Sequence, residues 1–143
     1  MNAILGFFGK YGFLSGFCRC TLKIEWKGEI FDFTCIDEAY NARRTFDIDV
    51  QKTFQSIGPR EATRKARDMK RRPGWRSARV EIMTNLVREK FRQNEGLAIL
   101  LLNTGDAHLE NTNRWGDKFW GVCDGEGQNN LGKILMEVRD EMK

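Results

Sequence analysis

The chain has 143 residues, of which 41% are apolar and 31% charged, with a formal net charge of +4. This length suits one globular domain, and the apolar share is sufficient for a core, which excludes an intrinsically disordered chain. The modest positive charge favours phosphate-bearing ligands or nucleic acid over cationic ligands, without choosing between the two. We therefore expect a single domain over residues 1–143.

The apolar N-terminal segment resembles neither a signal peptide nor a membrane span. It lacks a basic leading region, and glycines and Lys10 interrupt it before it reaches the roughly 20 apolar residues that a span needs. Four cysteines without C-x-x-C spacing and one histidine, His108, give no metal-site pattern. We expect a cytoplasmic protein with free thiols, and no metal, cofactor or membrane partner.

The first third of the chain predicts short strands and then a helix. Residues 4–8 predict a first strand. Residues 22–26 and 29–33 flank Lys27-Gly28, and the alternation in the first of these segments together with the Gly-ended turn predicts an antiparallel hairpin. Residues 36–46 carry apolar side chains at helical spacing and predict the first helix.

A strongly basic helix is predicted next. Gly58-Pro59 opens it, because proline is pre-set for a first helical turn, and Pro73-Gly74 ends it. Its cationic side chains are Arg60, Arg64, Lys65, Arg67, Lys70, Arg71 and Arg72. They are expected either to cradle phosphates or to form a solvated face.

Three further helices are predicted in the rest of the chain. Residues 75–93 place one apolar stripe inward, residues 97–102 are almost wholly apolar and should be buried, and residues 131–142 are amphipathic. The stripe of 75–93 consists of Val80, Met83, Leu86, Val87 and Phe91. Residues 103–130 predict a long loop rich in Asn, Gly and Asp, and loops of this length are often functional.

Several residues are candidates for chemistry, each with a structural alternative. Asp37-Glu38 either stabilise a cationic sugar or simply favour the start of a helix. The loop with Asp117 and Asn129 either binds an anion or sugar, or caps the last helix. Trp75 and Trp120 either stack on a base or pack in the core.

Taken in order, these segments resemble the YbiA-like (NADAR) family over nearly the whole chain. Residues 13–17 (FLSGF) resemble its F-x-S-N-F motif, and residues 33–44 (FTCIDEAYNARR) resemble its Y-P-[ST]-V-E-H-A-Y-Q-A-x-K segment. P-x-E-A and R-x-x-W elements match residues 59–62 and 72–75. The C-terminal third carries the strongest similarity, with the segments Lys90-Phe91, LLNTGD (101–106), DKFWG (117–121) and GQNNLGKILMEVR (127–139).

The resemblance implies an N-glycosidase with an α+β, predominantly helical fold and a small N-terminal antiparallel sheet. Some members act on ribosylamino-pyrimidine phosphates of riboflavin biosynthesis, and others remove ADP-ribose from guanine in DNA. The expected partner is therefore a phosphorylated ribosyl or ADP-ribosyl ligand, including ADP-ribosylated DNA. The expected catalytic residues are Asp37, Glu38 and Asp117, and the expected substrate-binding residues are Tyr40, Arg44, Trp75, Trp120, Gly121, Asn129 and Lys133.

Departures from the family pattern bear on catalysis. Asp37 and Glu38 stand where the family has Glu and His, Gly16 stands for Asn, and Arg44 stands for Lys. A guanidinium stays protonated and forms no Schiff base, so Arg44 cannot act as a nucleophile towards an opened sugar. One alternative is a non-catalytic module that binds ADP-ribose or an NAD-related nucleotide. Another is a nucleic-acid-binding protein that uses the basic helix and Trp75.

Overall fold

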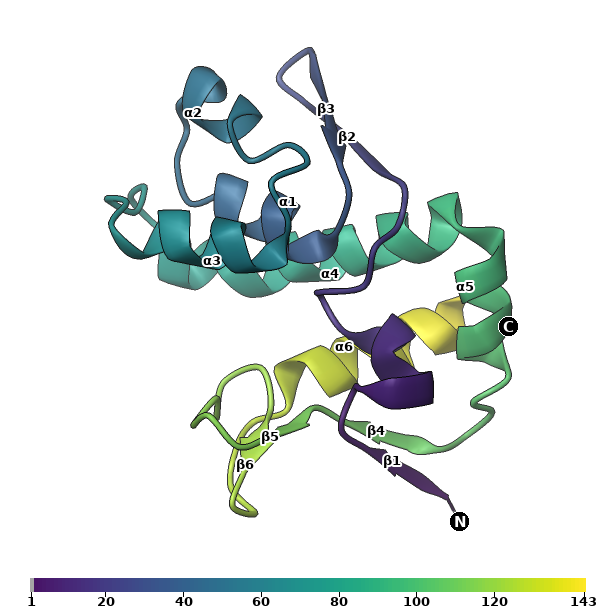
Figure 1. Ribbon diagram of the computed structural model, residues 1–143. Helices are drawn as coiled ribbons and strands as arrows, with labels where there is room; N and C mark the ends of the chain where they lie inside the picture. The colour runs from purple at the N-terminus through teal and green to yellow at the C-terminus, as the bar shows by residue number, and fades with distance from the viewer. Residues whose placement is uncertain (1) are drawn as a thin grey trace. The chain divides into compact units, whose positions relative to one another are not determined.

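The computed structural model describes residues 2–143, and its internal contacts divide the chain into two compact units. One unit is Gly16–Asn94, and the other contains the residues up to Ser15 together with Glu95–Lys143. The elements of each unit are shown in Figure 1. Among the helices of the described residues, none combines the length and the apolar composition that crossing a bilayer requires.

The unit 16–94 begins with the predicted hairpin. Strands β2 (Leu22–Trp26) and β3 (Glu29–Phe33) are antiparallel, with Leu22 opposite Phe33. Both turn residues, Lys27 and Gly28, have positive φ, which is the conformation of the tight turns that match strand twist. The small antiparallel sheet expected from the sequence is confirmed.

Four helices complete this unit: α1 (Ile36–Ala42), α2 (Ile48–Lys52), α3 (Pro59–Arg67) and α4 (Trp75–Gln93). Helix α1 packs against both α3 and α4 (Figure 1). The prediction that the first helix continues to residue 46 was wrong, because α1 ends at Ala42 and a separate helix follows. The Asp47 side chain caps that helix by accepting from the Val50 amide at 3.2 Å.

The basic helix is shorter than predicted. Pro59 opens α3 as expected, but the helix ends at Arg67, so Lys70, Arg71 and Arg72 lie outside it. The Arg72 amide instead donates to the carbonyl of Arg44 at 2.7 Å, which ties this segment to the end of α1. The seven cations therefore do not form one helical face.

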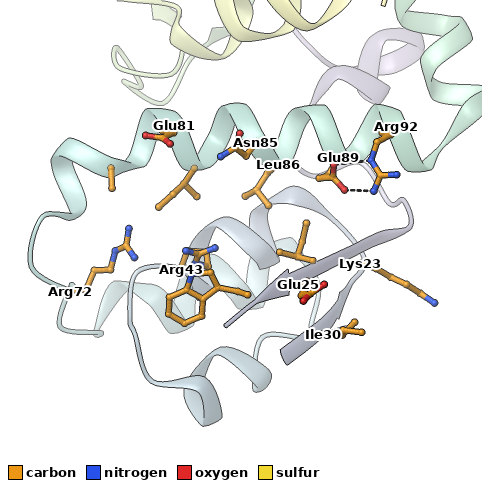
Figure 2. Close-up of a pocket in the computed structure, with 14 residues that line it drawn as sticks. Lys23, Glu25, Ile30, Arg43, Arg72, Glu81, Asn85, Leu86, Glu89 and Arg92 are labelled. Carbon is orange, nitrogen blue, oxygen red and sulfur yellow. Dashed lines mark hydrogen bonds and ion pairs between the residues drawn. The ribbon is translucent and has the colours of Figure 1, made fainter. Parts of the chain in front are cut away.

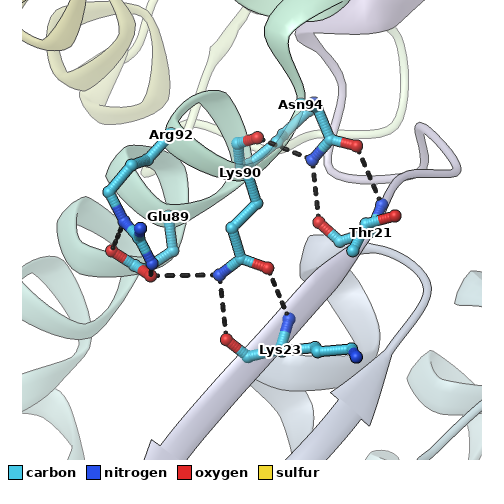
Figure 3. Close-up of polar contacts among 7 residues, drawn as sticks. Thr21, Lys23, Glu89, Lys90, Arg92 and Asn94 are labelled. Atoms are coloured by element: carbon cyan, nitrogen blue, oxygen red, sulfur yellow. Dashed lines mark hydrogen bonds and ion pairs between the residues drawn. The ribbon is translucent and has the colours of Figure 1, made fainter.

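Helix α4 has the predicted bounds and anchors the hairpin. Met83, Leu86, Val87 and Phe91 are buried as expected, whereas Val80 is 39% exposed and that part of the prediction was wrong. Figure 3 shows Asn94, just beyond α4, exchanging hydrogen bonds with the backbone of Thr21. Gln93 makes the same pair of bonds with the backbone of Lys23, so two amide side chains extend the edge of β2.

The other unit is built on two short parallel strand pairs. Strand β1 (Ala3–Leu5) pairs with β4 (His108–Glu110), and β5 (Thr112–Asn113) pairs with β6 (Val122–Cys123). The unit also contains a 3₁₀ helix, η1 (Gly9–Leu14), and the helices α5 (Glu95–Leu102) and α6 (Asn130–Glu141). The segment predicted as a continuous loop, 103–130, therefore contains three short strands.

Helix α6 behaves as predicted and α5 does not. Leu131, Ile134, Leu135 and Val138 of α6 are buried, and α6 packs on β4. In α5 only Leu101 is buried, and Ile99 is 52% exposed, so the expectation of a wholly buried helix was wrong. An all-apolar sequence carries no polar stripe, so its pattern could not indicate which face is covered.

Candidate functional site

Asp37 lies in the first turn of α1, against the backbone at Gly16. The Asp37 amide donates to the Gly16 carbonyl at 3.1 Å, and a Cβ atom added at Gly16 would collide with Oδ1 of Asp37. The glycine therefore provides the space that the carboxylate occupies. This accounts for one departure from the family motif, since any side chain at position 16 would displace the acid.

Tyr40, Arg44 and Trp75 form one aromatic and cationic cluster. The rings of Tyr40 and Trp75 are 5.1 Å apart and tilted by 54°, and the Arg44 guanidinium lies 5.4 and 5.2 Å from their centroids. Asn41 links this cluster to Asp37, because its amide nitrogen donates to the Asp37 carbonyl and its oxygen accepts from Nε of Arg44, both at 2.8 Å. Burial lowers the pKa of Arg44, and the negative charge of Asp37 partly opposes that shift.

Lys90 is a fully buried cation beside this acid, and the sequence-based list of site residues omitted it. Burial lowers the pKa of Lys90, and the negative carboxylate of Asp37 partly opposes the shift. The spacing gives a signal that could have revealed it. Lys90 follows Leu86 by four residues and Val87 by three, so it lies on the buried stripe of α4.

Two cysteine thiols near this amine have raised pKa values. Burial raises the pKa of Cys20 to about 11 and that of Cys35 to about 12. Thiols with such values remain protonated at neutral pH and are poor nucleophiles. The negative charge of Asp37 acts on two nearby cations, the amine of Lys90 and the guanidinium of Arg44.

Glu38 has a structural role. It is fully buried, and its Oε1 accepts from the amides of Thr34 (2.8 Å) and Ser56 (3.2 Å). Its Oε2 accepts from the Thr34 hydroxyl (2.8 Å) and from the amide of Gly58 (2.7 Å), at the start of α3. Both oxygens are thus occupied by protein donors, and this carboxylate joins the strand end after β3 to the loop before α3.

In the other unit, Asp117 organises the turn that carries Trp120. Its Oδ1 accepts from the amides of Phe119 (3.2 Å) and Trp120 (2.9 Å), and the rings of Phe119 and Trp120 meet edge to face at 4.8 Å. A Cβ atom at Gly121 would collide with the Asn111 carbonyl, so only glycine lets the backbone at residue 121 lie this close to the backbone at residue 111.

Asn129 holds the same loop together. Its Nδ2 donates to the Leu109 carbonyl at 3.0 Å and its Oδ1 accepts from the Asn111 amide at 2.9 Å, so the amide clamps β4 and the following segment to the start of α6. Asn129 has a left-handed φ of 54°, a conformation that asparagine tolerates better than most residues. Lys133, one turn into α6, is exposed.

The predicted site residues therefore divide between the two units. The structure brings Asp37, Tyr40, Arg44 and Trp75 together in the unit 16–94, with Glu38 in the same helix but turned to the backbone. Asp117, Trp120, Gly121 and Asn129 share one loop system in the other unit.

A groove of about 800 Å³ lies between the hairpin and α4 in the unit 16–94. Figure 2 shows Lys23, Glu25 and Ile30 on the hairpin side and Glu81, Asn85 and Glu89 along α4. We call it the hairpin groove. None of the predicted catalytic or substrate-binding residues lines it. Arg72, one of the basic residues expected either to cradle phosphates or to form a solvated face, does line it, as does Arg43, the neighbour of Arg44 in the chain.

Comparisons with known proteins agree with this architecture. A family model described as the NADAR domain matches residues 7–143. A riboflavin biosynthesis protein of Vibrio vulnificus is 36% identical over 140 residues, which are 93% of this chain but 36% of that protein, so the chain spans about a third of that relative.

Shorter relatives are matched over most of their length. The N-glycosidase YbiA of Escherichia coli is 30% identical over 139 residues, covering 92% of this chain and 82% of YbiA. The NMR structure of E. coli YbiA superposes with a TM-score of 0.83 at 29% identity, covering 99% of this chain and 86% of that one. The chain therefore belongs to the NADAR domain family and has the fold of YbiA.

Proposed function

We propose that this protein is an N-glycosidase that hydrolyses the C1′–N bond of a phosphorylated ribosyl or ADP-ribosyl compound. The observation that carries the proposal is the half-buried carboxylate of Asp37, held beside the Tyr40–Trp75–Arg44 cluster. Relatives named N-glycosidases and riboflavin biosynthesis proteins support the same reaction class.

The chemistry requires an anion next to the sugar. A C1′–N bond breaks through an oxocarbenium-like state, and a fixed carboxylate stabilises the developing positive charge or activates water. Asp37 fits this role better than Glu38, because four donors already occupy both oxygens of Glu38. Arg44 binds a phosphate as a rigid fork of donors, while the buried rings of Tyr40 and Trp75, which contact each other, support its guanidinium.

The loop of the other unit supplies the second part of the proposal. Oδ2 of Asp117 makes no hydrogen bond with any residue in the described range 2–143, whereas Oδ1 holds the turn. That free oxygen is available to a ribose hydroxyl or a water molecule. Trp120, Gly121, Asn129 and Lys133 belong to the same unit as Asp117, and their contact with a ligand stays a prediction from the family resemblance.

Two routes to the product differ in the nucleophile. In the first, Asp37 activates water, which attacks C1′ as the base leaves. In the second, the neutral amine of Lys90 displaces the base from C1′ and passes a proton to it, and the resulting glycosylamine opens its C1′–O4′ bond to an imine, which water then hydrolyses. The lowered pKa of Lys90 increases the fraction of neutral amine available for this attack. Borohydride added during turnover distinguishes them, since only an imine with Lys90 is reduced to a stable adduct, which mass spectrometry locates.

The direct test is incubation with two substrates, a ribosylamino-pyrimidine phosphate and DNA carrying ADP-ribosylated guanine. Chromatography should detect a released base or sugar from at least one of them. Absence of product from both at high enzyme concentration would contradict catalysis.

A second function is favoured by one observation, namely that Asp37 and Arg44 depart from the family pattern. The pocket would then retain ADP-ribose or a related nucleotide without turnover. Calorimetry with ADP-ribose and NAD tests this alternative: micromolar binding without product supports it, and product formation excludes it.

A further inference from the structure

Arg43 and Arg72 reach into the same end of the hairpin groove (Figure 2). Arg43 follows α1, and Arg72 lies in the segment before α4 that is tied by its amide to Arg44. Burial lowers the pKa of Arg43 to about 10, and the positive charge of Arg72 adds to that effect. Two cations therefore face each other at a site that is partly removed from water.

Within the described chain, neither guanidinium forms an ion pair or a hydrogen bond. The Nε atom of each is shielded from solvent and has no acceptor. Acidic groups do line the groove, but Glu89 is paired with Arg92, and neither Glu25 nor Glu81 bridges to either arginine. Charges that are partly removed from water are normally paired, so two neighbouring half-buried cations without an acidic partner indicate a place for an external anion.

Aromatic rings lie beside both guanidinium groups. Arg43 lies 4.4 Å from the Trp26 ring centroid, and Arg72 lies 4.5 Å from that of Phe46 and 5.8 Å from that of Trp75. Trp26 and Phe46 in turn stack on each other at 6.1 Å. Aromatic rings accept no conventional hydrogen bond, so the N–H groups of both guanidinium groups stay available, and their geometry matches the oxygens of a phosphate.

We propose that Arg43 and Arg72 form a phosphate subsite at this end of the hairpin groove. Because Arg72 also lies over Trp75, the subsite adjoins the Tyr40–Trp75–Arg44 cluster and takes a phosphoryl group of the ligand that this cluster binds. The proposal rests on the proposed function only for the identity of that ligand. The phosphoryl group belongs either to a phosphate monoester or to a nucleic-acid backbone.

Binding measurements without turnover test the subsite. Calorimetry uses ribose 5-phosphate, unphosphorylated ribose, and a short oligodeoxynucleotide lacking a terminal phosphate. The R43Q and R72Q variants should each weaken phosphate binding by at least about tenfold, because each loses charge-assisted hydrogen bonds. R92Q is the matched control, since Arg92 lines the same groove but already has Glu89 as partner, and it should bind as the wild type does.

The outcomes separate the two sources of phosphate. Weakening for ribose 5-phosphate supports a monoester, and weakening confined to the oligonucleotide supports a backbone phosphate. Unchanged binding of both ligands by R43Q and R72Q overturns the subsite. The Nε–H NMR signals of Arg43 and Arg72 give a second readout, which should shift on titration of the folded wild type with inorganic phosphate.

Failure of the subsite is distinguishable from failure of the proposed function. If R43Q binds normally while the wild type releases base, the subsite alone is wrong. If R43Q loses binding while the wild type releases no base from any substrate, the catalytic proposal alone is wrong.

Discussion

Asp37 and Glu38 are adjacent carboxylates whose surroundings give them different tasks. Successive helical positions face different directions, so Glu38 turns into the protein while Asp37 lies against Gly16. The sequence predicts that one of them serves chemistry. It could not say which, because the four donors that satisfy Glu38 come from Thr34 and from a loop some twenty residues further along the chain.

Glu38→Gln should destabilise the protein. A glutamine offers one oxygen and one NH₂ group, so in either orientation at least one backbone amide, that of Ser56 or Gly58, loses its acceptor and faces the buried NH₂ group instead. We expect a loss of about 1–3 kcal/mol in the free energy of unfolding, measured by urea denaturation. Glu61→Gln, at an exposed pair with Arg64, is the control and should change it by less than about 0.5 kcal/mol. Normal stability with lost activity would instead assign chemistry to Glu38.

Lys90 should give the folding free energy a particular pH dependence. Because burial lowers its pKa from the ordinary value of 10.5, the unfolded chain binds more protons than the folded one between the folded-state pKa and 10.5. Stability conferred by the wild-type residue therefore rises with pH through that window. Relative to Lys90→Met, the wild type should gain free energy of unfolding as pH rises from 7 towards 10. A constant or falling difference in urea denaturation would contradict a lowered pKa.

At the scale of elements, turn residues and apolar periodicity predicted a helix or strand correctly where the whole pattern lies within that element. The turn Lys27-Gly28 and the stripe of α4 predicted the hairpin and the longest helix with their bounds. The end of α3 could not be predicted, because Arg72 bonds to the distant carbonyl of Arg44. Helix α2 was missed, since five residues are too few to show a helical period.

The contact between Gly16 and α1 is an element-scale feature with a direct test. Gly16→Ala should displace the Asp37 carboxylate and reduce activity, with at most about 1 kcal/mol lost from the free energy of unfolding, because the added Cβ meets only the end of the Asp37 side chain. Gly96→Ala is the control, because its Cβ meets nothing within 4 Å and alanine favours a helix, so stability should be unchanged or slightly higher. Equal effects of the two substitutions on activity and thermal unfolding would show that Gly16 does not position the acid.

For the whole molecule, ordered motifs predicted the family and the fold class, which the NADAR match and the YbiA structure confirm. The motifs also gave Tyr40, Arg44 and Trp75 as substrate-binding residues, and the structure brings these three side chains together, while their role in binding stays a prediction. They did not reveal that the side-chain oxygen and nitrogen of Asn129 both hydrogen-bond to backbone groups. Nor did they reveal Arg43 and Arg72 as a pair, because that pairing depends on how the segment before α4 returns to α1.

The central claim is that the Asp37 carboxylate drives cleavage of a C1′–N bond. Its most direct test is the rate of base release by Asp37→Asn compared with the wild type, with thermal unfolding confirming that both are folded. The variant keeps the size of the side chain and removes its charge, so we predict a rate lower by about 100-fold or more. A folded Asp37→Asn variant that releases base at the wild-type rate would contradict the claim.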